Sequence, residues 1–471
     1  MLNRILENDT ICALATPHGM GAIAIVRISG PKALEIVASL FQQRGKSLET
    51  SEITSHKAYH GYLINNGEML DEVLVTFFRA PHSFTGEDLA EISVHGSVFV
   101  QQKLLQILIS HGCRMAEAGE FTRRAFVNRK FDLAQAEAIA DLISSESEAA
   151  HRVAINQLKG GFSKELQVMR SKLLEMTSLM ELELDFSEED VEFADRSQLK
   201  ALLEETLAHV NKLKDSFRLG NAIKNGVPVA IVGQTNTGKS TLLNALLGED
   251  RAIVSDIAGT TRDTIEETLN INGILYRFID TAGLRNTDET IEKIGIERSY
   301  KKIQEATLVV GMLDATKGAE NVLFAAKEIL EKMDLEHQKL ILCINKVDTL
   351  DDRGEALLGQ VRQALDNDDI MVVCLSAKHG FGLGDLYNTL KLIQPLASPD
   401  ATLVTNVRHY EALLHASESL KSVQQGLKMN IPTDLVSQDL REALHYLGSI
   451  TGEITTDEVL GNIFSRFCIG K

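Results

Sequence analysis

The 471-residue chain is predicted to fold as a multidomain α/β protein in which one domain is inserted into another. Residues 1–120 alternate strand and helix signals, which is typical of an α+β domain. Residues 121–218 and 386–471 carry apolar residues at helical spacing, whereas residues 219–385 alternate apolar strands with helices. The economical arrangement is an α/β domain at 219–385, inserted between two halves of a helical domain.

The elements of the N-terminal region follow from short local patterns. The expected elements are strands at 11–15 and 22–28, helices at 32–41 and 98–110, and a hairpin at 59–78. The hairpin prediction depends on Asn65-Asn66-Gly67, because Asn and Gly tolerate the positive φ angles of a tight turn. In the second helical half, helices are expected at 413–427 and 435–447.

Residues 233–240, with the sequence GQTNTGKS, lie between the apolar run 227–232 and the helical stretch 241–247. A strand, a glycine-bounded loop and a helix form the context of a phosphate-binding P-loop, because the loop N–H groups and the helix N-terminus face phosphate oxygens. In such a loop Lys239 would reach the β- and γ-phosphates and Ser240 would coordinate magnesium. The segment therefore predicts a nucleoside triphosphate site.

Two later segments predict that the base is guanine. Asp348 closes the tetrapeptide NKVD after an apolar strand, and its carboxylate can accept paired hydrogen bonds from guanine N1 and the exocyclic amine. Adenine lacks that pair of donors and would leave a buried carboxylate unsatisfied. Ala377, within the tripeptide SAK, is expected to donate its backbone N–H to guanine O6.

Two segments between these motifs are expected to complete the phosphate and magnesium contacts. Asp280, at the end of a strand, suits a water-mediated magnesium contact, and the Gly283 N–H suits the γ-phosphate. A hydroxyl from Thr260 or Thr261, with Thr261 the expected ligand, would complete the magnesium shell. The expected nucleotide-binding residues are Gly233, Asn236, Thr237, Gly238, Lys239, Ser240, Thr241, Ser255, Asp256, Ile257, Ala258, Gly259, Thr260, Thr261, Asp280, Thr281, Ala282, Gly283, Asn345, Lys346, Asp348, Ser376, Ala377 and Lys378.

The group that orients the attacking water is not obvious from the GTPase motifs. Many P-loop GTPases carry a glutamine for this purpose directly after Gly283, where this chain has Leu284. Glu292 is a candidate replacement, and the alternative is that it is a solvated first-turn carboxylate favoured by the helix dipole. Asn236 also has two interpretations: a ligand for a monovalent cation, or a turn residue that tolerates positive φ.

Composition limits the classes of function. A formal net charge of −18 argues against broad, non-specific nucleic-acid binding, which needs clustered Lys and Arg. Five cysteines without a CxxC pair indicate a reducing compartment. No signal peptide is evident and no apolar stretch approaches membrane-spanning length, so we expect a cytoplasmic location.

The sequence closes with Phe467-Cys468-Ile469-Gly470-Lys471, which is not a prenylation box because the last residue is charged. A terminal segment is normally frayed. Here Phe464 and Phe467 are expected to anchor the segment in a pocket, which would present Cys468 at a site.

Taken together, the chain resembles the MnmE/TrmE family of tRNA uridine-modification GTPases over essentially its whole length. The resemblance rests on the GTPase motifs and the FCIGK ending, together with Ala15-Thr16-Pro17 and the segments 83–88 (SFTGED), 119–126 (GEFTRRAF) and 132–138 (DLAQAEA). One departure is Gln234-Thr235, where the family often has Arg-Pro. These positions contribute mainly backbone, so nucleotide binding should survive the change.

The resemblance implies an N-terminal domain that is similar to tetrahydrofolate-binding domains and that also drives homodimerisation. It implies a FAD-dependent partner protein in a heterotetramer, and tRNA as the substrate. Together the two proteins would add an aminomethyl or carboxymethylaminomethyl group to C5 of the wobble uridine. The carbon would come from formyl- or methylene-tetrahydrofolate, and the nitrogen from ammonium or glycine.

The resemblance also implies residue roles. Folate contacts would fall on Arg27, Glu91, Lys130 and Lys471. Potassium ligands would be Asn236, Ser255, Ile257 and Thr260. Glu292 would orient the attacking water, and Cys468 would be functionally important in a chemical role that stays open. Potassium would supply the charge that an arginine finger gives elsewhere, while two GTPase domains close across residues 251–263 and 280–295.

Two other functions stay open at this point. The first is a switch GTPase of ribosome assembly, although no basic RNA-binding segment is evident. The second is a folate-dependent one-carbon transferase with a regulatory GTPase attached.

Overall fold

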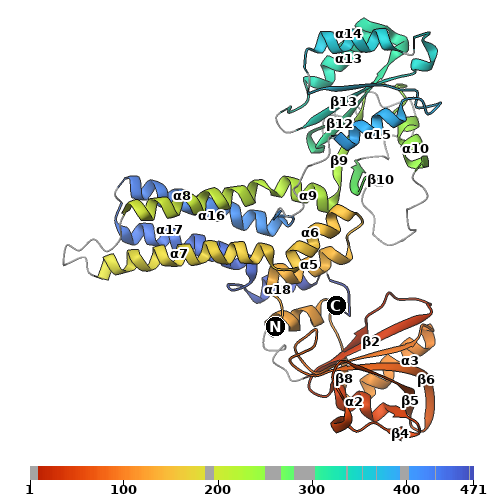
Figure 1. The fold of residues 1–471 in the computed structure, drawn as a ribbon, viewed down its shortest axis with the longest axis vertical. Coiled ribbons are helices and arrows are strands. Elements are labelled where there is room, and N and C mark those ends of the chain that lie inside the picture. The colour runs from red at the N-terminus through yellow and green to blue at the C-terminus, as the bar shows by residue number, and fades with distance from the viewer. Residues whose placement is uncertain are drawn as a thin grey trace. The chain divides into compact units, whose positions relative to one another are not determined.

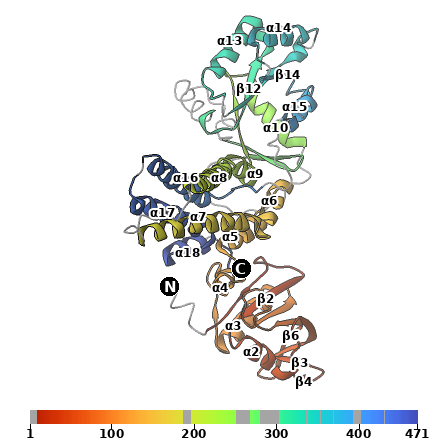
Figure 2. The ribbon, with the colours of Figure 1, turned by 60° about the vertical axis from the view of Figure 1, so that its left-hand side comes forward.

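A computed structural model describes ten stretches of the chain: residues 9–185, 196–249, 267–279, 303–335, 338–352, 354–367, 369–392, 402–429, 431–465 and 467–470. The chain divides into two compact units (Figures 1 and 2). The first comprises residues 1–143, 157–211 and 411–471, and the second comprises residues 144–156 and 212–410. The second unit thus interrupts the first in sequence, and it includes residues 144–156 from the range expected for the helical domain.

The N-terminal part of the first unit is an eight-stranded sheet in the order β4-β3-β5-β6-β7-β2-β1-β8. Its strands are β1 (Thr10–Leu14), β2 (Ile23–Ser29), β3 (Phe41–Gln43), β4 (Lys46–Ser47), β5 (Lys57–Asn65), β6 (Glu68–Phe78), β7 (Leu89–His95) and β8 (Cys113–Met115). The predicted hairpin is confirmed: β5 and β6 are antiparallel, and Asn66 and Gly67 between them have φ angles of 51° and 83°.

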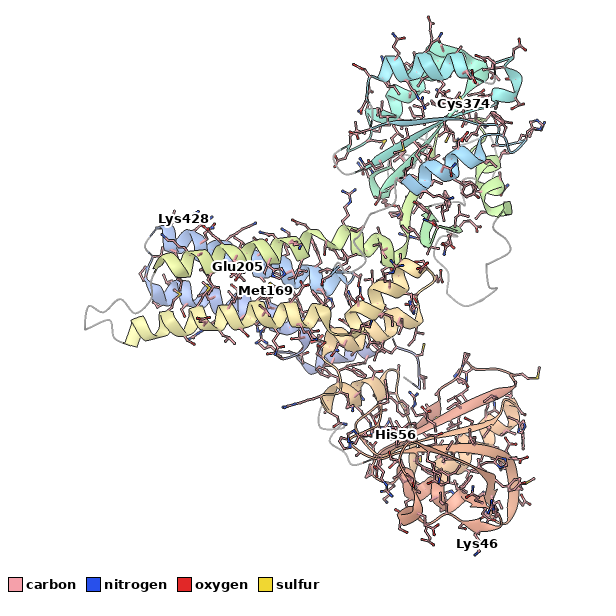
Figure 3. The ribbon with its side chains drawn as sticks, viewed as in Figure 1. Lys46, His56, Met169, Glu205, Cys374 and Lys428 are labelled. Carbon is pink, nitrogen blue, oxygen red and sulfur yellow. The ribbon has the colours of Figure 1, made fainter. Side chains whose placement is uncertain are left out.

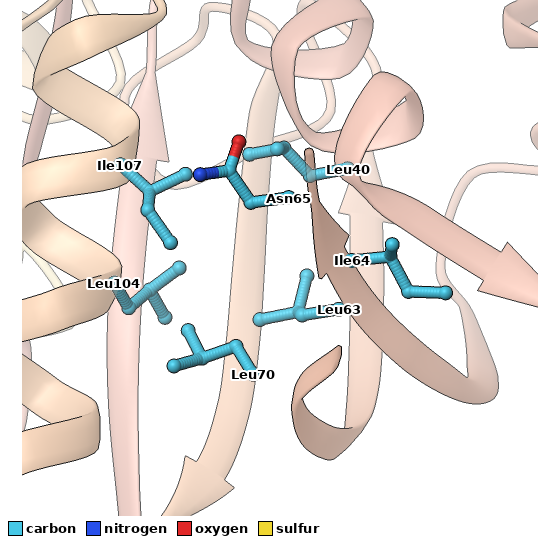
Figure 4. Close-up of a pocket in the computed structure, with 7 residues that line it drawn as sticks. All are labelled: Leu40, Leu63, Ile64, Asn65, Leu70, Leu104 and Ile107. Atoms are coloured by element: carbon cyan, nitrogen blue, oxygen red, sulfur yellow. The ribbon is translucent and has the colours of Figure 1, made fainter. Parts of the chain in front are cut away.

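Helices α2 (Ala33–Leu40) and α3 (Val98–Ser110) pack on this sheet and bury its core, where Val26, Phe77 and Leu108 are fully covered. A small hollow remains beside the hairpin, lined by Leu40, Leu63, Ile64, Asn65, Leu70, Leu104 and Ile107 (Figure 4). Among these seven residues only Asn65 is polar, so the hollow suits imperfect core packing better than a charged ligand.

The rest of the first unit is helical. Its helices, together with α8 and α16, which extend into the second unit, are α4 (Glu120–Val127), α5 (Leu133–Ile143), α7 (Gly161–Asp185), α8 (Arg196–Asp215), α16 (Val407–Lys428), α17 (Thr433–Thr451) and α18 (Asp457–Phe464). The helices predicted at 413–427 and 435–447 lie within α16 and α17. Helix α7 packs along α17, and Met169 of α7 is buried while Glu205 of α8 is exposed and pairs with Lys172 (Figure 3).

The second unit contains a six-stranded sheet in the order β10-β11-β9-β12-β13-β14. The strands are β9 (Val227–Val232), β10 (Glu267–Ile271), β11 (Ile274–Phe278), β12 (Leu308–Asp314), β13 (Lys339–Asn345) and β14 (Met371–Cys374). All neighbours are parallel except β10 and β11. The loops that follow β9, β13 and β14 therefore leave the same edge of the sheet, which is where ligands bind in open α/β folds.

Helices cover both faces of this sheet (Figure 1). Residues of α10 (Lys239–Glu249) and α15 (Leu383–Leu392) share one hydrophobic core, and residues of α13 (Ala319–Leu330) and α14 (Glu355–Leu365) share the other. The unit also holds α6 (Glu148–Leu158), whose last two residues belong to the first unit, and α9 (Phe217–Asn225). The predicted α/β fold class is confirmed. In the part of the chain that the structure describes, no helix is long and apolar enough to cross a membrane.

Candidate functional site

The loop from Gly233 to Gly238 joins the end of β9 to the start of α10, and three of its residues have positive φ. These are Gly233 (151°), Asn236 (61°) and Gly238 (97°). A Cβ on Gly238 would collide with the amide group of Asn345, so the loop tolerates only glycine there. Asn236 is thus a turn residue in the left-handed region, which leaves its second interpretation as a cation ligand open.

The positive charge of Lys239 lies over this loop. Its Nζ donates to the carbonyl oxygens of Gly233 at 2.9 Å and Gln234 at 2.8 Å. Ser240 and Thr241 follow in the first turn of α10, where the helix N-terminus is favourable for anions. A phosphate chain on this loop would therefore meet the ammonium group, backbone N–H groups and a hydroxyl.

Asn345 joins the three loops at this edge of the sheet. Its Nδ2 donates to the Thr237 carbonyl at 2.7 Å, and its Oδ1 accepts from the Ala377 N–H at 3.0 Å. The side chain is 3% exposed, so both bonds are shielded from water. The Ala377 N–H was expected to reach guanine O6, and a base bound here would share that donor with Asn345.

Asp348 follows β13 and is exposed, so the buried carboxylate expected from the sequence is not found. His379 approaches it, with 3.7 Å between Nε2 and the Asp348 carboxylate. The Ser376 hydroxyl, with a smaller contribution from His379, lowers the pKa of Asp348 and keeps the carboxylate charged. Lys346 instead pairs with Asp314 at 2.7 Å. The sequence motif thus provides one ionised carboxylate at the place where two base N–H groups would arrive.

Thirteen predicted site residues lie outside the described part of the chain, and their roles stay predictions. They are Ser255, Asp256, Ile257, Ala258, Gly259, Thr260, Thr261, Asp280, Thr281, Ala282, Gly283, Glu292 and Lys471. Among the residues that are described, no group of three or more His, Cys, Asp or Glu side chains is arranged to hold a metal ion.

A second polar site lies in the first unit, where Arg27 of β2 is directly opposite Glu91 of β7. Arg27 donates to Glu91 Oε1 from Nε at 2.9 Å and from Nη2 at 2.7 Å. The guanidinium also lies 5.2 Å from the ring centre of Phe84 and 5.7 Å from that of Phe121. Two aromatic rings and a carboxylate thus hold the Arg27 guanidinium in place more firmly than a single ion pair would.

Lys130 is linked to the Arg27–Glu91 pair by the adjacent residue, Phe131. Its Nζ donates to the Pro81 carbonyl at 3.0 Å, and the adjacent Phe131 ring lies 5.9 Å from that of Phe84. The structure therefore brings Arg27 and Glu91 into direct contact and connects Lys130 to them through aromatic side chains.

The segment 467–470 lies against this site. Phe464 and Phe467 are buried among Leu133, Ala136 and Leu460, so the expected aromatic anchor is present. The Gly119 N–H donates to the Cys468 carbonyl at 3.4 Å, and Arg27 Nη1 donates to the Gly470 carbonyl at 3.3 Å. The Cys468 side chain, between these two attachments, is exposed.

A buried ion network that sequence reasoning missed supports Phe121. Arg124, in the same helix α4, is 2% exposed and pairs with Asp9, Glu87 and Glu120. Burial opposes the ionisation of Glu120, but hydrogen bonds, chiefly from Arg114, lower its pKa to about 2. Most of the charged residues of this network lie in the segments 83–88 and 119–126. A pairing of their charges could have revealed the network.

Comparisons with known proteins agree along the whole chain. The family model described as the MnmE helical domain matches residues 133–468, and the model described as the GTP-binding protein TrmE N-terminus matches residues 10–130. The tRNA modification GTPase MnmE of Bacteroides fragilis is 50% identical over 468 residues, which cover 99% of this chain and 100% of the relative. The protein of the same name from Flavobacterium johnsoniae is 49% identical over 475 residues, again covering 99% and 100%.

Solved structures match parts of the chain. Era of Aquifex aeolicus bound to GDP and AlF4⁻ is 27% identical, with a TM-score of 0.28, and the match covers 41% of this chain and 66% of that one. The G domain of FeoB from Methanococcus jannaschii is 27% identical, with a TM-score of 0.25, and the match covers 35% and 96%.

Proposed function

The chain belongs to the MnmE family of tRNA modification GTPases, and from that premise we propose that it uses GTP hydrolysis to drive modification of the wobble uridine at C5. The observation that carries the proposal is the presence of two different sites in one chain. One is the P-loop edge of the second unit, and the other is the Arg27–Glu91 pair beside an exposed cysteine. This full-length family membership favours tRNA modification over the ribosome-assembly alternative.

At the first site, the residues have separate tasks. Lys239 and the loop N–H groups hold the phosphates, and Asp348 selects guanine. Ser240, in the first helical turn, offers the hydroxyl oxygen that suits Mg²⁺, with Thr261 as the second ligand. Glu292 orients the attacking water in place of the missing glutamine.

A monovalent cation completes this site in our proposal. The left-handed turn at Asn236 places an amide-bearing residue within the phosphate loop, and amide oxygens suit K⁺. The other ligands of this cation would be Ser255, Ile257 and Thr260, and a cation held there would supply positive charge next to the phosphates. Equal rates of GTP hydrolysis in sodium and in potassium would count against this part of the proposal.

At the second site, we propose that a reduced folate binds. The Glu91 carboxylate suits the paired N–H donors of a pterin, and basic side chains such as Lys130 and Lys471 suit a glutamate tail. Arg27, bonded to Glu91, would be the folate contact at the pterin end. The one-carbon unit would be formyl- or methylene-tetrahydrofolate. The chain would act as a homodimer in the cytoplasm with a FAD-dependent partner protein in a heterotetramer, and Cys468 would take part in the modification.

The nucleoside profile of bulk tRNA tests this function. A deletion strain would be complemented with the wild-type chain, with Cys468→Ser and with the matched control Cys374→Ser, and its tRNA analysed by liquid chromatography and mass spectrometry. We expect the C5-modified uridine to return with the wild type and the control only. An unchanged profile in the deletion strain would contradict the proposal, and ribosome profiles on a sucrose gradient would then test the alternative.

A further inference from the structure

One guanidinium group connects the second site to the 467–470 segment. Arg27 uses Nε and Nη2 for Glu91 and Nη1 for the Gly470 carbonyl. It makes both contacts at once, so neither excludes the other. The ring centres of Phe84 and Phe121 lie 5.2 and 5.7 Å from Arg27 Cζ, and the two rings limit how far the guanidinium can turn.

Beyond the buried Phe467 side chain, the 467–470 segment is held through its backbone. Ile469 forms an antiparallel bridge with Ala118, next to the hydrogen bond between Gly119 and Cys468. Gly470 has a φ of 98°, and a Cβ there would collide with the carbonyl oxygen of Leu14. Only glycine can take this position. Arg27 then holds the segment at Gly470 by donating to its carbonyl oxygen.

We propose that Arg27 is a positioning residue that couples the occupancy of Glu91 to the seating of the 467–470 segment, and so to the presentation of Cys468. The inference rests on the proposed function only for the identity of the ligand, a reduced folate. A ligand that holds Glu91 restricts Arg27, and a restricted Arg27 keeps its bond to Gly470. Ligand binding at Glu91 and docking of the 467–470 segment therefore favour each other, and the coupling is reciprocal.

Hydrogen exchange of the full-length protein tests the coupling without any ligand. No hydrogen bond or ion pair joins Glu91 to residues 467–470, yet Glu91→Ala should raise exchange several-fold at Gly119 and in the peptide that spans 464–471. Glu72→Ala, an exposed glutamate in the same sheet, is the matched control and should leave both unchanged. Equal exchange in Glu91→Ala and wild type would overturn the proposal, and thermal melting confirms that each variant folds.

A second arm uses 5-formyltetrahydrofolate as the probe. At a probe concentration that saturates each protein, the probe should slow exchange of the 464–471 peptide several-fold in the wild type and leave it unchanged in Arg27→Ala. Gly470→Ala, which disturbs the segment but not the Arg27–Glu91 pair, should weaken probe binding by the same factor, while Gly461→Ala, with open space around its Cα, should not. Binding that leaves the exchange unchanged overturns the coupling. Absence of binding to the wild type overturns the folate proposal instead, and the Glu91→Ala result then decides the coupling alone.

Discussion

The two sites of this chain are built in opposite ways. The nucleotide site consists mostly of backbone groups on loops that leave one edge of a parallel sheet, and its side chains mainly hold those loops in place. The Arg27–Glu91 site consists of side chains on paired strands, held by aromatic rings and a buried ion network. A site built from backbone groups depends on space and chain conformation, whereas a site built from side chains depends on charge.

The largest effect is expected from filling space at the backbone-built site. Gly238→Ala places a Cβ against the Asn345 amide at a residue with positive φ. The backbone can relieve this clash only by giving up the conformation of the phosphate loop. We expect GTP hydrolysis to fall roughly 100-fold, about 3 kcal/mol. Phosphate release under saturating GTP measures it. Gly248→Ala, in the same helix as Lys239 with open space around it, is the control; a comparable loss there would mean that α10 is simply intolerant of alanine.

The second-largest effect is expected from acid, which should destabilise the ion network in the first unit. Glu120 has its pKa lowered to about 2, so the ion network is formed above the ordinary value of 4.5 and is lost as pH falls from there towards 2. The lost stabilisation is on the order of 2–3 kcal/mol in the first unit. Circular dichroism melting between pH 7 and pH 3 would measure it. Glu120→Gln should show a flatter pH dependence, and an unchanged slope would mean that the network does not control acid stability.

Base preference is the exception at the nucleotide site, because it depends on a side chain: in our proposal Asp348 reads the base. Asp348→Asn removes the double acceptor, so we expect GTP affinity to fall about 30-fold, about 2 kcal/mol, and affinity for xanthosine triphosphate to rise. Competition against a fluorescent GDP analogue measures both. Asp352→Asn is the control, since that carboxylate accepts only from backbone N–H groups of its own loop. A preference that stays with guanine would show that the base is read elsewhere.

The smallest effect is expected at Lys130. Its ammonium group is exposed and bonds only a carbonyl oxygen in the structure, so its contribution to folate binding is that of a solvated cation. Lys130→Ala should weaken 5-formyltetrahydrofolate about threefold, less than 1 kcal/mol, as measured by isothermal titration. The exposed Lys103→Ala on α3 should have no effect. A loss of more than tenfold would mean that Lys130 is a principal contact.

The difference between local backbone patterns and contacts between distant side chains also explains what could be predicted from the sequence. The hairpin turn at Asn66-Gly67 and the loop between β9 and α10 are local patterns, and the structure has both where they were expected. Arg27 meets Glu91 across 64 residues and Gly470 across 443, and no local pattern announces such contacts. The proposed folate contacts are therefore implied only by the family resemblance, and no sequence pattern predicts the aromatic rings around Arg27. The inclusion of residues 144–156 in the second unit was missed because helical periodicity does not say what a helix packs against.

The bond between Asn345 and the Thr237 carbonyl spans 108 residues and bears on synthesis of the chain. A ribosome releases the phosphate loop long before it releases the amide that braces it, and Ala377 emerges later still. The nascent loop thus lacks its support during that interval, and nucleotide retention begins only when β13 and β14 have joined the sheet. Capture of GTP by a ribosome-bound chain would therefore report completion of the second unit's parallel sheet.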